Sequence, residues 1–219
     1  MTDNSQLKMY PIKKIADGGV HITGDATSPG WNQGLPLGDF SYPWEKETPR
    51  RTSFKAVHDT HTIYFFFDVD DPHVHVEKST DDKMDVIDCS RVEIFFRKDA
   101  QLSPYYCLEI DPTGRVLDYQ GYFHRQFDFA WSWPANSMSV ATRQNMAGYT
   151  VEIAISKQSL CSLGLLSEDR GQLQAGLFRA DNTHPVRPRE HMRWISWMRP
   201  DAPTPDFHIP SAFGLLQLQ

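Results

Sequence analysis

The feature that most constrains the fold is a succession of short segments in which apolar residues occupy every second position. In residues 91–97 (RVEIFFR), Val92, Ile94 and Phe96 fall on one face of an extended chain, while Glu93 and both arginines fall on the other. Similar segments recur along most of the chain, at residues 52–57, 62–69, 104–111, 115–120, 137–142, 148–155, 173–181, 193–197 and 213–218. The pattern predicts about ten strands.

Turn signals separate these segments, and helical signals are nearly absent. Residues 111–114 (DPTG) are typical of a tight turn, because proline presets φ and glycine tolerates a positive φ. Only residues 156–163 resemble a helical turn, with Ser156 as its N-cap. We therefore predict an all-β fold, an antiparallel β-sandwich with long loops and little helix.

The length of 219 residues suits one large domain, since β-sandwiches of about 200–250 residues commonly form a single unit. We predict one domain at residues 20–219, preceded by an N-terminal extension at residues 1–19. Two stretches with several prolines, 181–193 and 199–210, are too long for plain turns. Long loops on a rigid sandwich are where ligand contacts tend to lie, so both are candidate contact regions.

Composition excludes several classes of partner. With 22 Lys and Arg against 28 Asp and Glu, the formal charge of −6 argues against nucleic acid. The longest apolar run, residues 63–67, is far too short to span a membrane. The acidic N-terminus lacks a signal peptide, which predicts a cytoplasmic protein, or a secreted or periplasmic one if a leader was trimmed. Cys89, Cys107 and Cys161 form no CxxC motif and are predicted free thiols.

An acidic, histidine-containing stretch follows the strand predicted at residues 62–69. Carboxylates at alternate positions suit calcium, and Asp70 and Asp71 are the candidate ligands, although the glycine and terminal glutamate of an EF-hand loop are missing. His73 and His75 would share one side of an extended segment and suit a transition metal. A solvated strand end without any metal is the third interpretation.

Two glutamates are candidates for ligand chemistry. If residues 91–97 and 104–111 are neighbouring strands, Glu93 and Glu109 share a sheet face, with Asp111 near its end and Arg179 joining from a third strand. Such a set forms either a ladder of cross-strand ion pairs or a site that binds a polyhydroxylated ligand by charge-assisted hydrogen bonds. A third interpretation is the carboxylate pair of a glycoside hydrolase. No nucleophile elbow, phosphate loop or HExxH motif indicates another enzyme chemistry.

Aromatic residues offer surfaces for stacking or for packing. Trp131 and Trp133 point to one side of an extended loop segment, where they either stack on the C–H face of a sugar or pack over a sheet edge. Trp194 and Trp197 are predicted core residues, because most tryptophans of a sandwich are buried. Phe207 lies in the second of the long loops.

A series of short motifs runs in order through residues 20–219. They are GD at 24–25 with Trp31, IYFFF at 63–67 leading into Asp71-Pro72, RVEIFF at 91–96, IDPTG at 110–114, GYTVEIAI at 148–155, RAD at 179–181, ISW at 195–197 and PSAFG at 210–214. This series resembles carbohydrate-binding module family 9. The resemblance implies a DOMON-like β-sandwich, sugar binding at a cleft lined by two stacked tryptophans, and bound calcium ions.

The resemblance also assigns individual positions. The sugar-binding glutamate of the family falls on Glu93. Its two cleft tryptophans fall on Ile87 and Phe207, so this chain has one aliphatic and one aromatic replacement. The family's arginine on the next strand falls near Glu109, and its asparagine two residues later falls near Asp111.

We predict a non-catalytic protein, similar to a carbohydrate-binding module, that recognises a sugar or oligosaccharide with structural support from calcium. Phe207 would stack on the sugar, and Trp131 or Trp133 would supply a second ring. Hydrogen bonds to hydroxyls would come from Glu93, Glu109, Asp111 and Arg179. Two alternatives stay open: a carboxylate-based enzyme for a glycoside-like substrate, and a DOMON-like redox domain that holds haem through Met84 and His208.

Overall fold

The computed structural model describes residues 7–77, 80, 82–167, 169–182 and 191–219. Within them, no helix is long and apolar enough to cross a membrane. Short helices occur at Lys157–Ser162 (α1) and, in 3-10 form, at Pro29–Gln33, Lys83–Asp88 and Pro210–Ala212. The strands are β1 (Met9–Lys14), β2 (Thr52–His58), β3 (Thr62–Asp70), β4 (Arg91–Arg97), β5 (Tyr105–Ile110), β6 (Val116–Tyr122), β7 (Gln126–Asp128), β8 (Met138–Asn145), β9 (Gly148–Ser156), β10 (Leu166–Ser167), β11 (Gln172–Asn182), β12 (Met192–Ser196) and β13 (Gly214–Leu218).

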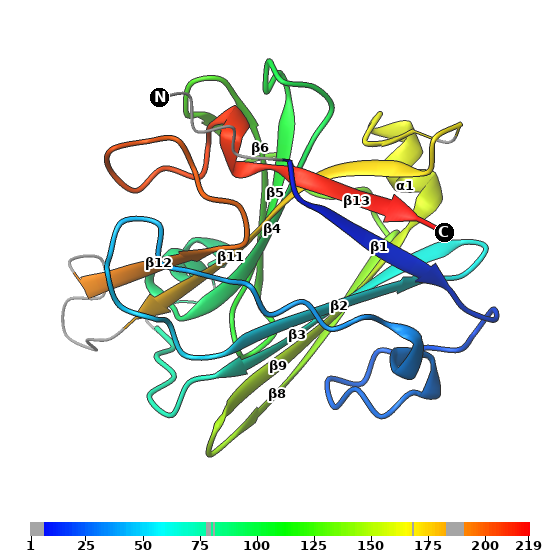
Figure 1. The fold of residues 1–219 in the computed structure, drawn as a ribbon, viewed down its shortest axis with the longest axis horizontal. Coiled ribbons are helices and arrows are strands. Elements are labelled where there is room, and N and C mark those ends of the chain that lie inside the picture. The colour runs from blue at the N-terminus through cyan, green and yellow to red at the C-terminus, as the bar shows by residue number, and fades with distance from the viewer. Residues whose placement is uncertain (1–6, 78–79, 81, 168, 183–190) are drawn as a thin grey trace.

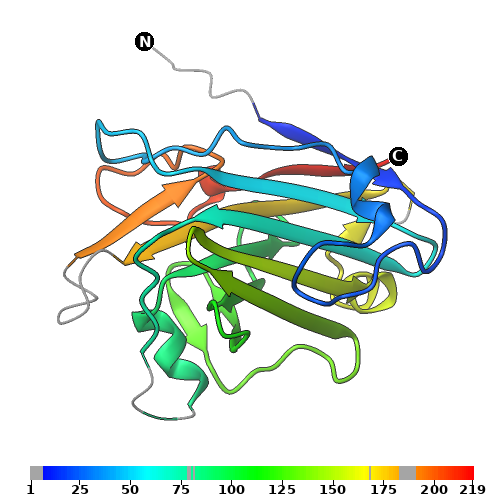
Figure 2. The same cartoon turned by 90° about the horizontal axis from the view of Figure 1, so that it is seen from below.

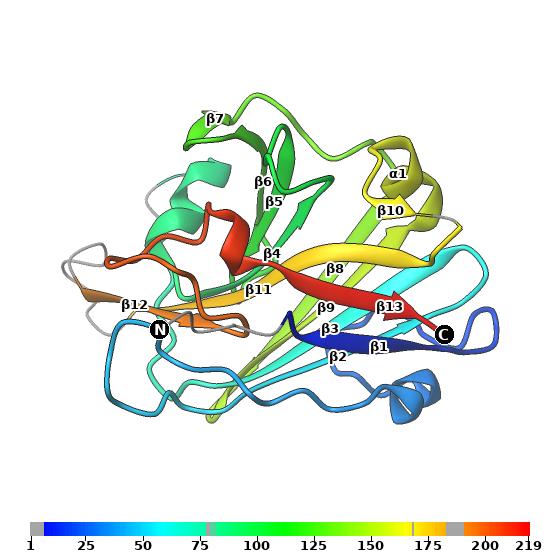
Figure 3. The ribbon, with the colours of Figure 1, turned by 45° about the horizontal axis from the view of Figure 1, so that its top comes forward.

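The strands form one strongly curled, mixed sheet that folds over on itself (Figure 1, Figure 2). Its order is β7-β6-β5-β4-β11-β13-β1-β2-β3-β9-β8, with β10 and β12 paired to β11. The two parallel pairings belong to β1, which lies between β13 and β2 (Figure 3). The half from β7 to β11 and the half from β2 to β8 therefore become two layers of one structure.

The main core fills the space between these two layers. Val92, Ile94 and Phe96 of β4 point into it and are fully buried, as their alternation in the sequence predicts. From the other layer, Phe65 of β3 contacts Phe96, with ring centroids 5.9 Å apart. Each such side chain contributes about 1.5–3 kcal/mol when it leaves water, so this face of every strand turns inward.

A second apolar cluster covers the opposite face of β4, β5, β6 and β11. Phe95 of β4 and Phe178 of β11 pack edge to face here, with ring centroids 5.0 Å apart. The segment at residues 199–213 and the 3-10 helix at Lys83–Asp88 add side chains from above. Both faces of this layer are thus covered, and all seven residues of β4 are buried, charged ones included.

The predicted all-β architecture with little helix is confirmed, and each predicted strand is present. α1 occupies the predicted helical turn, where the Ser159 amide donates to Ser156 Oγ at 3.2 Å. The short strands β7 and β10 were not predicted. β1 was not predicted either, because the sequence analysis assigns residues 9–14 to an N-terminal extension. These residues lie in the sheet, and Tyr10 and Ile12 enter the main core. The structural unit therefore begins before residue 20.

The three cysteines are free thiols. Cys89 and Cys107 are buried, whereas Cys161 is partly exposed. Burial raises the pKa of Cys89 to about 11, so its thiol stays protonated in neutral solution. The Cys89 thiol also accepts from Arg115 Nη2 at 3.3 Å and donates to the Asp85 carbonyl at 3.3 Å.

Candidate functional site

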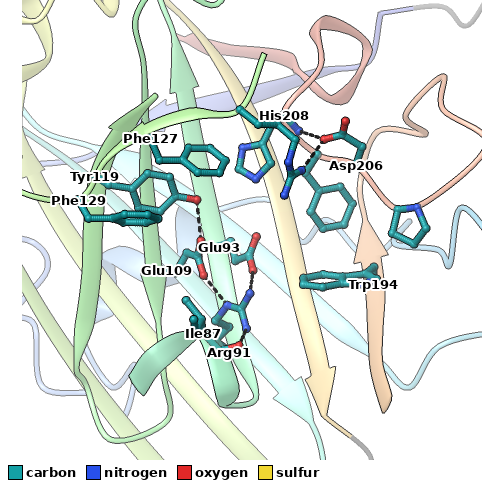
Figure 4. A pocket seen from close by; sticks show the side chains of 13 residues that line it. Ile87, Arg91, Glu93, Glu109, Tyr119, Phe127, Phe129, Trp194, Asp206 and His208 are labelled. Carbon is teal, nitrogen blue, oxygen red and sulfur yellow. Dashed lines mark hydrogen bonds and ion pairs between the residues drawn. The ribbon is translucent and has the colours of Figure 1, made fainter. Parts of the chain in front are cut away.

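A cavity of about 210 Å³ opens on the outer face of the layer that contains β4, β5 and β6 (Figure 4). The three positions that the family resemblance assigns to the sugar cleft, Ile87, Glu93 and Phe207, all line it. The complete lining consists of Ile87, Arg91, Glu93, Glu109, Tyr119, Arg125, Phe127, Phe129, Trp194, Pro205, Asp206, Phe207 and His208. Residues far apart in the sequence therefore converge on one hollow.

Glu93 and Glu109 form the polar floor of the cavity. They are direct partners across the antiparallel strands β4 and β5, as predicted, and are only 2% and 5% exposed. Arg91 bridges them, with Nη2 2.8 Å from Glu93 Oε1 and Nε 2.6 Å from Glu109 Oε2. Buried charges are tolerated only when they are paired, so one guanidinium holds both carboxyl groups in place.

Neighbouring groups orient this floor through further hydrogen bonds. Arg91 Nη1 donates to the Ile87 carbonyl at 2.9 Å, and the Tyr119 hydroxyl donates to Glu109 Oε1 at 2.8 Å. Arg91 Nε, Glu93 Oε1 and Glu109 Oε2 are all engaged in the ion pairs of Arg91. The second oxygen of Glu93 is turned away from Arg91 and is the group of this floor that a ligand could contact (Figure 4).

The protonation of Glu93 is unusual. Its pKa is raised to about 8, because burial disfavours the charged form and the charge of Glu109 repels it, while Arg91 acts in the opposite direction. Glu93 therefore keeps its proton to a higher pH than an ordinary glutamate does.

This raised pKa predicts how stability depends on pH. The folded-state pKa lies above the unfolded value of about 4.3, so the contribution of Glu93 is full below that value and is lost as the pH rises toward 8. We expect Glu93→Gln to raise the melting temperature at pH 9 by a few degrees, at about 2–4 °C per kcal/mol, and to change it less at pH 5. Thermal unfolding followed by circular dichroism measures both.

The matched control for this substitution is Glu47→Gln, at a glutamate whose side chain is 73% exposed. It should change the melting temperature by the same small amount at both pH values, because exposed ion pairs contribute about 0–1 kcal/mol. A Glu93→Gln effect that is equally large at pH 5 and pH 9 would contradict the assigned proton.

Aromatic rings stand on both sides of the polar floor. Figure 4 shows Trp194 of β12 on one side of Arg91, and Tyr119, Phe127 and Phe129 on the other. Phe127 and Phe129 contact each other with ring centroids 5.7 Å apart, and Phe129 is 37% exposed. Trp194 is half-buried, and the Arg91 guanidinium lies 5.5 Å from its ring. Apolar walls with a few fixed polar groups are the usual composition of a small-molecule site.

Phe207 lines the cavity but presents little ring surface to it. It is 5% exposed, and one face stacks on Phe178 with centroids 4.0 Å apart and an interplanar angle of 11°. Trp194 meets Phe207 edge-on at 5.7 Å. Trp194, which the sequence predicted as a core residue, is thus the more open of the two rings, and Phe207 supports it from behind.

Charged residues close the rim. The carboxylate of Asp206 lies 3.0 Å from Arg125 Nη1 and 3.0 Å from His124 Nε2. These two contacts join the turn between β6 and β7 to the segment at residues 199–209. Burial and the charge of Arg125 lower the pKa of His208 to about 3, so its imidazole is neutral. Met84, the second haem candidate, packs in the outer apolar cluster and is not among the residues that line the cavity with His208.

The predicted position of Arg179 beside Glu93 is wrong. The register of β11 against β4 places Phe178, and not Arg179, opposite Glu93. Because a shift of one residue moves a side chain to the other face, Arg179 points away from the cavity. It is fully buried, with Nη2 3.4 Å from Asp71 and 3.5 Å from Asp181.

Three other predicted contact residues lie outside the cavity. Asp111 is buried in the turn after β5, where it accepts from the Thr113 amide at 2.8 Å and pairs with Arg115 at 2.7 Å. Trp133 is buried in the main core, and Trp131 packs against it with ring centroids 5.8 Å apart. Of the two interpretations of these tryptophans, the structure favours packing over a sheet edge.

The calcium candidates do not converge on a common site. Asp70 pairs with Arg51 at 2.8 Å near the surface, whereas Asp71 is buried beside Arg179. Within the described residues, no group of three or more His, Cys, Asp or Glu side chains is placed to hold a metal ion. Asp70 and Asp71 as they stand do not fit a calcium ligand set, and calcium binding stays a prediction.

Most residues of the aromatic walls and of the charged rim were not predicted from the sequence: Tyr119, Phe127, Phe129, Arg125 and Asp206. Tyr119 alternates with polar residues on β6, but its meeting with Glu109 depends on the register of β5 against β6, which places Leu117 opposite Glu109. Phe127 and Phe129 carry the alternation of a strand in a segment too short to stand out. The predicted contact loop at residues 199–210 does reach the cavity, whereas residues 183–190 of the other loop lie outside the described residues.

Comparison with solved structures finds proteins of similar fold. A crystal structure of a Bacteroides uniformis protein, for which carbohydrate binding is suggested, has a TM-score of 0.73 at 18% identity and covers 98% of this chain and 100% of its own. A family 9 carbohydrate-binding module of Caldicellulosiruptor kristjanssonii in complex with cellotriose has a TM-score of 0.63 at 15% identity, with coverage of 97% and 94%. The same organism's module with glucose has a TM-score of 0.61 at 16% identity, with coverage of 97% and 96%.

These likenesses show a shared fold, and the sequence itself shows the family. No curated protein matches the chain significantly. The model of the carbohydrate family 9 binding domain-like family, however, matches residues 22–219, which is nearly the whole chain. The chain therefore belongs to the carbohydrate family 9 binding domain-like family.

Proposed function

We propose that this protein binds a sugar in the cavity over β4, β5 and β6, and that it does so without chemical conversion. The observation that carries the proposal is the buried floor of Arg91, Glu93 and Glu109 between two aromatic walls, with the second oxygen of Glu93 turned away from Arg91. Hydroxyl groups of a sugar suit such a floor, and its C–H faces suit the rings. The Caldicellulosiruptor kristjanssonii modules of similar fold were solved with cellotriose and glucose, which supports this ligand class.

The cavity favours one sugar unit over a long chain. Its volume of about 210 Å³ is below the roughly 300–1,000 Å³ that is typical of ligand pockets. A longer oligosaccharide would place one terminal unit inside and extend past the rim, where Phe129 is exposed.

The carboxylates are arranged for binding. Glu93 and Glu109 lie side by side on one floor and share Arg91 (Figure 4). Glycoside hydrolysis instead uses two carboxyl groups that flank the scissile bond. We therefore prefer recognition to the carboxylate-based enzyme, which the sequence had left open.

Titration calorimetry with glucose, mannose, galactose and cellotriose tests the proposal, with Trp194→Ala as the variant. Loss of a central aromatic contact typically costs about 1–2 kcal/mol, so we expect affinity to fall by roughly 5- to 30-fold. Trp131→Ala is the matched control, because Trp131 is also partly buried but lies outside the cavity, and it should leave affinity unchanged. Absence of binding to every sugar, or equal losses in both variants, would overturn the proposed site.

A further inference from the structure

The floor of the cavity holds one carboxylate more than its cation can balance. Glu109 stands directly opposite Glu93, where the family resemblance places an arginine, and the guanidinium comes instead from Arg91 on the strand of Glu93. Like charges directly opposite each other on a sheet are destabilising. Two buried carboxylates that share one site therefore tend to retain a proton between them.

We propose that Glu93 enters the site as a carboxylic acid, donates its hydrogen bond to an oxygen of the bound sugar, and so makes the cavity selective for neutral sugars. This inference rests on the proposed function and adds the ligand's charge and the role of one residue to it. It also makes binding depend on a proton that the protein already carries.

The contacts identify Glu93 as the carboxyl that keeps the proton. Glu109 lies 2.6 Å from Arg91 Nε and accepts the Tyr119 hydroxyl at 2.8 Å, and both groups stabilise its negative charge. Glu93 has a single charged contact, Arg91 Nη2 at 2.8 Å. Figure 4 shows its second oxygen turned away from Arg91, toward the side where Asp206 and His208 lie. The raised pKa of Glu93, about 8, agrees with this assignment.

The remaining charges around the cavity balance in pairs. The titratable or charged groups that surround Glu93 are Arg91 on β4, Glu109 and the buried Cys107 thiol on β5, Tyr119 on β6, and Arg125, Asp206 and His208 across the cavity. Its partner on β11 is the apolar Phe178. Arg125 pairs with Asp206, His208 is neutral, and burial keeps the Tyr119 hydroxyl protonated. With Glu93 protonated, neither an ammonium nor a carboxylate on the sugar would find an unpaired opposite charge.

The first arm of the test is the pH profile of affinity, measured by calorimetry for each sugar of the panel that binds. We expect affinity to fall roughly tenfold between pH 7 and pH 9, in proportion to the protonated fraction of Glu93. Glu93→Gln should bind with little dependence on pH, because a carboxamide also donates a hydrogen bond. Glu109→Gln removes the repelling charge, so the fall should occur at a lower pH.

The second arm compares charged sugars at pH 6.5. The amino sugar, as its ammonium form, and the uronic acid that correspond to the bound hexose should each bind at least tenfold more weakly than the parent. Tighter binding of the amino sugar would show an anionic floor and overturn the inference.

The third arm needs no ligand. In ¹³C NMR of the free protein, one glutamate carboxyl should titrate near pH 8, and this titration should be missing in Glu93→Gln. A wild-type affinity that is constant from pH 6 to pH 9.5, or a Glu93 carboxyl that titrates below pH 6, overturns the inference and leaves sugar binding intact. Failure of every sugar to bind at any pH overturns the proposed function itself.

Discussion

Replacing Arg91 by methionine should lower the free energy of unfolding by about 3–5 kcal/mol at pH 7. Arg91 is the shared counterion of Glu93 and Glu109, and all three side chains are at most 6% exposed. Without the guanidinium, two carboxyl groups stay buried opposite each other, and one of them loses the partner of its charge. Urea unfolding followed by tryptophan fluorescence gives the difference directly.

Two further variants separate charge pairing from simple packing. Adding Glu93→Gln and Glu109→Gln to Arg91→Met replaces both buried acids by neutral amides and should restore most of the lost stability. Arg51→Met is the matched control, because Arg51 contacts two aspartates but its side chain is 51% exposed, and it should cost at most about 1 kcal/mol. A triple variant as unstable as Arg91→Met alone would mean that Arg91 acts through its packing against Trp194.

Replacing Phe207 by alanine should cost about 3–5 kcal/mol of stability and also weaken sugar binding. Phe207 is 5% exposed and fills the space between Phe178 and Trp194, so its removal leaves a cavity and takes away the support behind Trp194. Urea unfolding measures the stability, and calorimetry measures the affinity at a temperature where the variant is folded.

Phe129→Ala is the control for this substitution. Phe129 lines the same cavity but is 37% exposed, so its loss should reduce affinity while changing stability by less than about 1 kcal/mol. We therefore expect Phe207→Ala to lower stability much more than Phe129→Ala does. Equal effects of both substitutions on stability would contradict the supporting position assigned to Phe207.

Much of the fold can be predicted from the sequence because its strands alternate so regularly. The three apolar side chains of residues 91–97 that alternate toward one face all enter the main core. β1 escaped prediction for two physical reasons. Pro11 argues against a central strand, and the longer parallel pairing of β1, with β13, joins residues at opposite ends of the chain. β1 tolerates Pro11 because it pairs with β13 at residues 9–12 and with β2 only at residues 13–14.

The site was predictable where it depends on neighbouring strands. The pairing of Glu93 with Glu109 follows from the hairpin-like order of β4 and β5. Arg179 was misplaced because the register of β11 against β4 is set by distant contacts, and one residue of shift changes the face. The sequence predicts a buried Trp194, because the packing of residues 199–209 beside it, which sets its exposure, leaves no local pattern.

The most direct test of the central claim is a map of amide NMR shifts during titration with the tightest-binding sugar of the panel. If the cavity is the sugar site, saturable shifts should concentrate on β4, β5 and β6 around Arg91, Glu93 and Glu109, and around Trp194 and residues 205–208. The amides around Trp131 and around Asp71 should stay unchanged. Shifts centred on those residues, or no saturable shift with any sugar, would contradict the account.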